Sequence, residues 1–148
     1  MNNLKNKFTE KKILDIARNV LEIESTEVLR LSQKLDDQFV RAAKTIFSCK
    51  GRVVVSGMGK SGHIGNKIAA TLASTGTSSF FPHPAEAQHG DLGMVKSEDI
   101  VIAISYSGET EELCKLAPLF KRLGSTLVSL TGNPNSSLAT LSDIHLNV

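Results

Sequence analysis

From Gly51 onward, short runs of β-branched and aliphatic residues alternate with longer segments of helical spacing. This pattern constrains the fold most, because strands that are apolar almost throughout and separated by helices are typical of a parallel sheet covered on both faces. Strands are predicted at 52–56, 78–81, 99–105 and 125–130, with a last one beginning near Asp143, and helices at 61–74, 109–123 and 136–141. Residues 51–148 are therefore predicted to form one α/β domain with a central parallel sheet.

The first fifty residues have a different pattern. Apolar residues recur every three or four positions over 13–46, without a glycine or proline, which predicts one long or two consecutive amphipathic helices. Thr9 can cap the start of the first helix, and the Asp36-Asp37 pair is a candidate break. We expect residues 1–50 to form an N-terminal helical segment that packs on the domain or on a partner subunit.

Composition and charge exclude several classes of function. The net charge of +2 is spread thinly, with no basic block to bind a phosphate backbone, so nucleic acid is not an expected partner. The longest apolar runs, such as 100–104, are too short to span a bilayer, and no apolar stretch follows the basic start, so neither a membrane anchor nor a signal peptide is expected. Cys49 and Cys114 lack metal-ligand spacing and fit free, buried thiols in a reducing cytosol, which predicts a cytoplasmic protein.

Two loops rich in glycine and hydroxyl residues each follow a predicted strand. The first is SGMGKSG, residues 56–62, and the second is SYSGET, residues 105–110. In an open parallel sheet, ligands bind beyond the carboxyl ends of the strands, where such loops lead into helix N-termini. Amides, hydroxyls and the positive end of a helix suit an anion, and a phosphate group is the simplest one. The alternative is that each loop is only a turn.

The first loop resembles two nucleotide-binding motifs and matches neither fully. A P-loop requires a glycine where Val54 stands, so that interpretation fails. Gly57-x-Gly59-x-x-Gly62 matches the dinucleotide-binding pattern, but the acid expected at the end of the next strand is missing from TSSFFPHP. No cofactor is therefore predicted.

The segment FPHPAEAQHGDLGM, residues 81–94, is a third candidate. If Pro84 begins a short helix, Glu86 and His89 share one of its faces. A carboxylate and an imidazole that converge on a ligand are the groups that general acid–base proton transfer needs. The alternative is a polar loop in which Glu86 caps backbone amides and His89 is solvated. The two histidines of this segment, without a cysteine, make a poor zinc site.

Lys60, Glu111 and Glu112 are individually ordinary residues. A lysine in a glycine-rich loop is commonly solvated, and glutamates in a first helical turn are favoured by the helix dipole. They become candidates because the predicted sheet brings the starts of both helices to the same edge.

Taken together, SGMGKSGHIGNKIAATLASTGT, FPHPAEAQHGDLGM and IAISYSGETEEL resemble the sugar isomerase (SIS) domain. More narrowly, SGMGKSG with HGDLGM is similar to the D-arabinose 5-phosphate isomerases of 3-deoxy-D-manno-octulosonate (Kdo) biosynthesis. The resemblance implies a flavodoxin-like, three-layer α/β fold and subunits that associate into dimers or tetramers. It also implies an aldose–ketose isomerase of lipopolysaccharide biosynthesis, which interconverts D-ribulose 5-phosphate and D-arabinose 5-phosphate through a cis-enediol.

The resemblance also implies roles for individual positions. The family's catalytic lysine, histidine and helix-start glutamate fall on Lys60, His89 and Glu112. In a related SIS branch the glutamate of an ExxHG segment is the base, so Glu86 shares the proton-transfer role in our interpretation. His83 is a position where zinc is expected to bind as an inhibitor. From the two loops and the resemblance together, the expected substrate-binding residues are Ser56, Gly57, Ser61, Gly76, Thr77, His83, Ser105, Ser107 and Thr110.

Two features of the family are missing from this sequence. Family members carry a further glutamate after the strand at which the sequence stops and a later histidine, and many also carry two CBS regulatory domains. We therefore expect this chain, with the C-terminal part of the SIS domain missing, to bind a sugar phosphate and to isomerise it poorly or not at all. Two alternatives stay open: a sensor or regulatory SIS module that binds without catalysis, and an inactive subunit that folds only on association.

Overall fold

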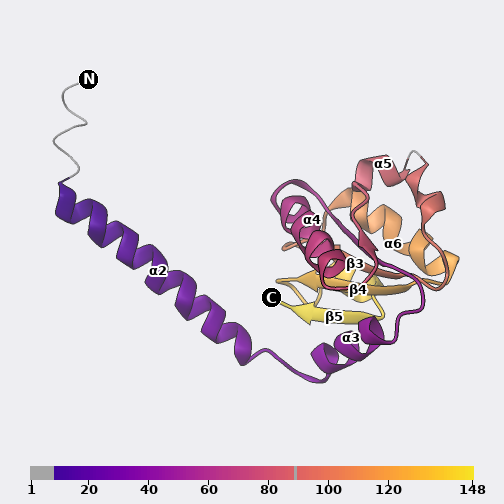
Figure 1. Ribbon diagram of the computed structural model, residues 1–148, viewed down its shortest axis with the longest axis horizontal. Coiled ribbons are helices and arrows are strands. Elements are labelled where there is room, and N and C mark those ends of the chain that lie inside the picture. Colours follow the sequence, from indigo (N-terminus) through magenta and orange to yellow (C-terminus); the bar gives the residue numbers. More distant parts are fainter. Residues whose placement is uncertain (1–8, 89) are drawn as a thin grey trace. The chain divides into compact units, whose positions relative to one another are not determined.

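The computed structural model describes residues 9–88 and 90–148 (Figure 1). Contacts within the chain divide it into two compact units, the first ending at Leu35 and the second running from Asp36 to Val148. The described part of the first unit contains one helix, α2, and the second unit contains the sheet with the helices that cover it.

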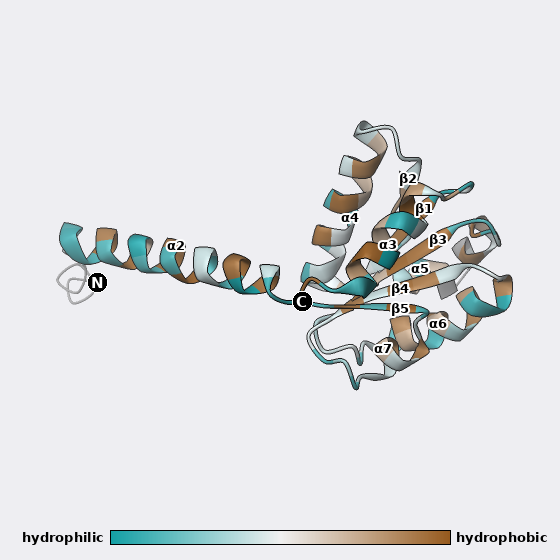
Figure 2. Ribbon diagram, turned by 90° about the horizontal axis from the view of Figure 1, so that it is seen from below, coloured by the Kyte–Doolittle hydropathy of each residue, from teal (hydrophilic) through white to brown (hydrophobic). Residues whose placement is uncertain are grey.

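Helix α2 (Glu10–Ser32) forms the first unit. Its predicted cap is confirmed, because Thr9 Oγ1 accepts a hydrogen bond of 3.3 Å from the amide of Lys12. None of its residues is buried within the described part of the chain, and Figure 2 shows hydrophobic and hydrophilic residues alternating along it. Its exposed large apolar side chains are Ile13, Leu14, Ile16, Val20, Leu21, Ile23, Val28, Leu29 and Leu31.

The break predicted at the aspartate pair is confirmed, because helix α3 (Asp37–Phe47) begins there. Asp36 is its N-cap and accepts hydrogen bonds from two amides of the first turn. Ala42 of α3 is buried, and the helix packs on strand β5 (Ile144–Asn147). Helix α3 thus belongs to the same compact unit as the sheet, although the sequence pattern changes only after residue 50.

Five parallel strands form the sheet in the order β2-β1-β3-β4-β5. This is the strand order of flavodoxin-like folds, so the predicted parallel α/β fold is confirmed. The switch point lies between β1 and β3, because the sheet grows to one side after β1 and to the other side from β3 onward. Besides β5, the strands are β1 (Val53–Gly57), β2 (Ser79–Phe80), β3 (Ile100–Ile104) and β4 (Thr126–Thr131).

Helices cover both faces of the sheet and complete three layers. Residues of α3 and α4 share an apolar cluster with Val53 and Val55, whereas residues of α5, α6 and α7 share one with Val54. All three valines are fully buried, which explains why the strands are apolar at consecutive positions. The helices are α4 (Gly59–Ser74), α5 (Pro84–Gln88), α6 (Glu111–Leu123) and α7 (Ser137–Leu141), with a short 3₁₀ turn at Asp91–Met94.

At the amino-terminal edge of the sheet, the buried carboxylate of Asp99 joins several segments. It accepts hydrogen bonds from the amides of Arg52 (2.7 Å) and Lys96 (2.9 Å), and the Arg52 guanidinium lies 3.4 Å away. That guanidinium also stacks on the ring of Phe80 and donates to the carbonyl of Met94. A carboxylate that would be costly to bury alone is thereby satisfied, at the edge opposite to the two glycine-rich loops.

Candidate functional site

The two glycine-rich loops of the sequence leave the sheet side by side. Strands β1 and β3 are paired with Gly57 opposite Ile104, so both loops start from the same edge at the same level. This edge is the switch point of the sheet, where ligands bind in folds of this class. Helix α4 begins after the first strand and α6 after the second, so the positive ends of two helices meet there.

Loop 105–110 is closed by its own hydroxyl groups. The buried Ser105 Oγ lies 2.7 Å from Thr110 Oγ1 and 3.4 Å from Ser107 Oγ. The amide of Gly108 donates to Ser105 Oγ over 3.1 Å, and the amide of Glu109 donates to Ser107 Oγ over 3.2 Å. The three hydroxyls expected to bind a phosphate therefore form one cluster next to the first turn of α6.

Helices α4 and α6, which follow the two glycine-rich loops, lack side-chain caps at their N-termini. Within the described residues, the N-cap residues Met58 of α4 and Thr110 of α6 make no capping hydrogen bond, and the Thr110 hydroxyl is turned toward Ser105 instead. The first-turn amides of both helices are thus left to a ligand, and an anion suits them. Side-chain caps are present on α2, α3 and α7, from Thr9, Asp36 and Ser136.

A second turn, residues 131–137 between β4 and α7, packs against loop 105–110. Gly108 adopts a φ of +68°, and a Cβ there would lie 2.0 Å from Ser136 Oγ, so this contact requires glycine. The amide of Leu138 donates to the Gly108 carbonyl over 3.0 Å. The loop is therefore held in position by a segment that the sequence identified only as a turn.

Glu109 connects the same two segments through its side chain. Its carboxylate accepts a hydrogen bond of 2.8 Å from the amide of Ser137, the first residue of α7. The two residues lie 28 positions apart, and no local pattern pairs them, so reasoning from the sequence missed this contact. The signal that was present is the TGNPNS turn, whose residue types favour such side-chain and backbone bonds.

The titratable groups near the loop are shifted by their hydrogen bonds and by burial. Hydrogen bonds from Ser137 hold the pKa of the Glu109 carboxyl below its ordinary value. Burial raises the pKa of the Cys114 thiol, and the charge of Glu109 adds to this, so the thiol stays protonated and donates to a loop carbonyl. Glu111 forms an exposed ion pair with Lys115 at 2.5 Å, which lowers the pKa of Glu111 and raises that of Lys115.

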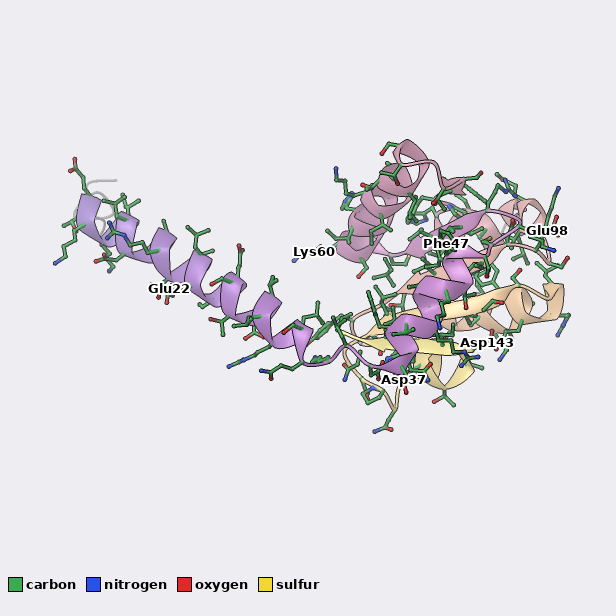
Figure 3. The ribbon with its side chains drawn as sticks, turned by 60° about the horizontal axis from the view of Figure 1, so that its bottom comes forward. Glu22, Asp37, Phe47, Lys60, Glu98 and Asp143 are labelled. Atoms are coloured by element: carbon green, nitrogen blue, oxygen red, sulfur yellow. The ribbon has the colours of Figure 1, made fainter. Side chains whose placement is uncertain are left out.

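Lys60 and Glu112 are each the second residue of a helix, α4 and α6, and these helices cover opposite faces of the sheet. Lys60 lies in the first turn of α4, and its exposed side chain extends outward from the start of that helix (Figure 3). Glu112 lies in the first turn of α6 and is half-buried. Because both helices begin at the switch point, the structure brings these two candidates to the same edge of the sheet. Ser61 follows Lys60 on α4 and is half-buried.

Ser56 and Gly57 form the buried carboxyl end of β1. The Ser56 hydroxyl is fully buried and donates to the carbonyl of Pro82 over 3.0 Å, so it anchors the segment that leads into α5. A Cβ on Gly57 would lie 3.0 Å from the Ser61 carbonyl oxygen, so the lack of a side chain there permits the start of α4 to approach the strand closely. We therefore interpret Ser56 as a residue that positions its neighbours, and Gly57 as one that permits close packing.

The third candidate segment also reaches this edge. Pro84 begins helix α5 as predicted, and Ala87 packs in the same apolar cluster as α6. Glu86 is exposed on α5, and the half-buried His83 precedes the helix. His89 lies outside the described residues, so the face it was predicted to share with Glu86 is not described.

Gly76 and Thr77 are not brought together with the other candidates. They follow the C-terminal end of α4, and the next residue, Ser78, accepts a hydrogen bond from the amide of Val53 at the start of β1. The sixteen residues of α4 span about 24 Å at 1.5 Å per residue, which separates Thr77 from Lys60 within one subunit. Both residues thus lie at the amino-terminal edge, at the opposite end of α4 from the switch-point loops, and their role in substrate binding stays a prediction.

The described residues include neither a cluster of metal ligands nor a membrane-spanning helix. Across residues 9–88 and 90–148, no three His, Cys, Asp or Glu side chains gather as ligands for a metal ion, so His83 has no such set there. In that same part of the chain, no helix combines the length and the apolar character needed to cross a bilayer. Cys49 and Cys114 are free thiols and are half-buried, less enclosed than the sequence suggested.

A known family model matches more than half of this chain. Residues 46–148 match the family model described as the SIS domain. This chain belongs to the SIS domain family. The match contains both loops of the switch point and segment 81–94, so the family and the flavodoxin-like fold predicted from the sequence are confirmed.

Curated relatives of this chain share one name. The proteins named arabinose 5-phosphate isomerase KdsD from Escherichia coli K12 and from Pseudomonas aeruginosa are 56% and 55% identical to it over 131 residues. These matches cover 88% of this chain and 40% of each relative. The chain therefore spans about 40% of the length of the curated relatives it matches.

Solved structures agree with this assignment. A structure from E. coli CFT073, described as a complex with arabinose 5-phosphate, is 41% identical, has a TM-score of 0.90, and is matched over 95% of this chain and 74% of that chain. The structure of a proposed sugar-phosphate isomerase from Listeria monocytogenes has a TM-score of 0.89 at 35% identity, over 93% of this chain and 72% of that chain. The NanR protein of Vibrio vulnificus, in complex with ManNAc-6P, shares the fold at 19% identity, with a TM-score of 0.75 over 93% of this chain and 55% of that chain.

Proposed function

We propose that this SIS domain serves the interconversion of D-ribulose 5-phosphate and D-arabinose 5-phosphate, in Kdo and lipopolysaccharide biosynthesis. The observation that carries the proposal is the hydroxyl cluster of Ser105, Ser107 and Thr110 at the uncapped start of α6, on the same sheet edge as Lys60. The names of the curated relatives and the arabinose 5-phosphate complex of the E. coli CFT073 structure support the choice of substrate.

The phosphate of the sugar would bind at loop 105–110. The hydroxyl groups of Ser107 and Thr110 and the first-turn amides of α6 offer donors, and the helix dipole favours the negative charge. In the described structure, Ser107 Oγ accepts from the amide of Glu109, and its own hydrogen can still be donated to a phosphate oxygen. Anchoring the phosphate orients the reacting carbons, and orientation by itself lowers a barrier by several kcal/mol.

The chemistry at the other end of the sugar is a proton transfer between C1 and C2. A base removes the C1 proton of the open-chain ketose to give a cis-enediol, and the proton returned to C2 gives the aldose. Lys60, as a cation at the start of α4, would stabilise the negative oxygen that develops in this step. We assign the base to Glu86 or Glu112 and the transfer between oxygens to His89, whose ordinary pKa of about 6.5 suits it near neutral pH.

A phosphosugar-binding module without catalysis is the second candidate function. The observation that favours it is that loop 105–110 is closed by its own hydroxyl groups and needs none of the candidate catalytic residues for its shape. A sensor needs this loop and has no need of Lys60 together with an acid and an imidazole. Binding without turnover would therefore separate the two functions.

We further propose that the protein works as a homo-oligomer in the cytoplasm. Helix α2 exposes nine large apolar side chains, and Phe47 at the end of α3 is 95% exposed, so association with a second copy would remove much apolar surface from water (Figure 3). The two free thiols suit a reducing compartment. Light scattering after size exclusion tests the oligomeric state directly: a monomeric mass would refute it.

An isomerase assay tests the proposed function. D-Ribulose 5-phosphate would be incubated with this chain and with a version extended to the length of its relatives, and arabinose 5-phosphate would be measured. Thermal shifts with arabinose 5-phosphate, with D-arabinose and with inorganic phosphate would report binding in parallel. Stabilisation by the sugar phosphate with turnover in the extended version supports the isomerase, and stabilisation without turnover in either version supports the sensor. No stabilisation by the sugar phosphate and no turnover would refute both.

A further inference from the structure

Loop 105–110 receives support from outside its own hydroxyl cluster. The turn at 131–137 contacts it through the Gly108–Ser136 approach and through the bond from the Leu138 amide to the Gly108 carbonyl. Both of these contacts involve the backbone of the loop and fix one residue of it. The amide of Gly132 in the turn also donates to the Tyr106 carbonyl over 2.8 Å, near the start of the loop. The end of the loop next to α6 is linked through the side chain of Glu109, which accepts from the amide of Ser137 at 2.8 Å.

Glu109 is an unexpected residue at a phosphate-binding loop. Its negative charge opposes an anion bound nearby, so electrostatics alone would favour its removal. Its carboxylate, however, lies at the positive start of α7 and takes up an amide that would otherwise lack an intrahelical partner. The charge is thus used in a contact with α7 rather than with a ligand of the loop.

We propose that Glu109 is a positioning residue, which holds loop 105–110 in its phosphate-binding shape by binding the Ser137 amide at the start of α7. The amide of Glu109 itself donates to Ser107 Oγ, and the next residue is the N-cap of α6. Fixing the Glu109 side chain therefore limits movement of Ser107 on one side and of Thr110 on the other. The inference rests on the proposed function, since it concerns the geometry of the proposed phosphate site.

Two substitutions break this contact from opposite ends. Glu109→Ala removes the acceptor together with its charge. Ser137→Pro removes the donor and keeps the charge, and the site accepts proline, because Ser137 is the first residue of α7 and Ser136 is extended with φ −70° and ψ 159°. Glu109→Gln keeps an oxygen acceptor and should restore most of the contact. Glu111→Ala is the matched control, since it removes an equally exposed acid two residues away that binds Lys115 instead.

Binding of arabinose 5-phosphate and of inorganic phosphate to these variants of the 148-residue chain would be measured by calorimetry. We expect the dissociation constants to rise by about 3- to 10-fold in Glu109→Ala and in Ser137→Pro, the effect of losing one hydrogen bond. The double variant should be no worse than either single one, because both remove the same contact. Glu109→Gln should bind nearly as the unmodified chain does, and Glu111→Ala should bind equally well or more tightly.

The direction of the change in phosphate binding separates a positioning role of Glu109 from a purely electrostatic one. If Glu109 acts only as a nearby charge, Glu109→Ala and Glu111→Ala both tighten phosphate binding and Ser137→Pro changes nothing, which would overturn the inference. Additive losses in the double variant would overturn it as well. A loss of binding that Glu109→Gln does not restore would do the same.

Hydrogen exchange in the absence of ligand separates this inference from the proposed function. We expect faster exchange at the amides of 107–112 in Glu109→Ala and Ser137→Pro, with unchanged exchange in β1 and β3. If the unmodified chain binds neither arabinose 5-phosphate nor inorganic phosphate, the proposed function fails, and the exchange result alone decides on the contact. Faster exchange confined to the loop and the turn then supports it, and unchanged exchange overturns it.

Discussion

The hydroxyl groups of Ser105 and Thr110 lie 2.7 Å apart and join the two ends of loop 105–110. Ser105 directly follows β3 and is buried, whereas Thr110 is the half-buried N-cap of α6. The bond turns the Thr110 hydroxyl away from the amides of its own helix. As a result, the helix start stays open on the side where the site is proposed.

Thr110→Val should weaken binding of a sugar phosphate while preserving the fold. Valine keeps the shape of threonine and removes the hydroxyl, so both its bond to Ser105 and one hydrogen bond to a charged phosphate are lost, and KM for arabinose 5-phosphate should rise by about 10- to 100-fold. Steady-state kinetics on the extended version would measure this. Thr71→Val is the control, because the Thr71 hydroxyl only bonds to the Lys67 carbonyl within α4. Equal KM values for the two variants would contradict the assignment of Thr110.

Lys60→Ala should reduce turnover without reducing stability. The side chain is exposed, so its loss leaves no cavity, whereas the loss of one group that stabilises a developing oxyanion costs about 100- to 1,000-fold in kcat. The control is Lys67→Ala, an exposed lysine two turns later on the same helix. Assays of both variants with arabinose 5-phosphate, together with their thermal unfolding, would check this. Unchanged kcat in Lys60→Ala would remove the lysine from the mechanism.

Gly108→Ala should destabilise the domain by about 2–3 kcal/mol. Its φ is +68°, and the new Cβ would lie 2.0 Å from Ser136 Oγ, so strain and overlap add together. Gly59→Ala has a comparable φ of +54° with no heavy atom within 4 Å, and should cost about 1 kcal/mol. Urea unfolding of both variants gives the comparison. If Gly59→Ala were the more damaging of the two, the packing between loop and turn would be disproved.

Ser129→Ala should leave stability unchanged or raise it by up to about 1 kcal/mol. Ser129 lies in β4 and is fully buried, and its hydroxyl has no hydrogen-bond partner among the described residues. Removing a buried polar atom that has no partner relieves a desolvation cost. Ser125→Ala should instead lose about 1 kcal/mol, because the Ser125 hydroxyl donates to the Lys96 carbonyl at 2.9 Å. A loss in Ser129→Ala as large as in Ser125→Ala would show that the hydroxyl is in fact bonded.

The contact between Glu109 and Ser137 should depend on pH with a definite sign. The pKa of Glu109 is lowered in the folded chain, so its stabilising effect is complete above the ordinary carboxyl value and is lost as pH falls through the folded value. Ser137→Pro should return the pKa of Glu109 toward its ordinary value, measured by NMR titration of the side-chain carboxyl. The stability difference between this variant and the unmodified chain should shrink below pH about 4. A difference that grows on acidification would contradict the sign.

The positions of the strands, helices and glycine-rich loops followed from the sequence, because each depends on local spacing. Apolar runs such as 53–55 are buried on both faces, and Asp36 and Thr9 cap helices through amides only a few residues away. The sequence also predicted that the loops 56–62 and 105–110 lie close together, because the carboxyl ends of parallel strands meet at one edge of the sheet. The sequence did not predict that Gly76 and Thr77 lie at the far end of α4 from Lys60. The resemblance identifies positions along the chain and does not show how far a helix separates them.

The sequence by itself determined the parallel α/β fold, the family and the residue types available for binding a phosphate. Only the tertiary structure decided how loop 105–110 is held, because Glu109 meets Ser137, and Gly108 meets Ser136, across a distance in sequence that no periodic pattern spans. Such contacts arise when separate segments pack at the same edge of a sheet. Their partners are set by the order of the strands and the length of the connections, which local propensities do not contain.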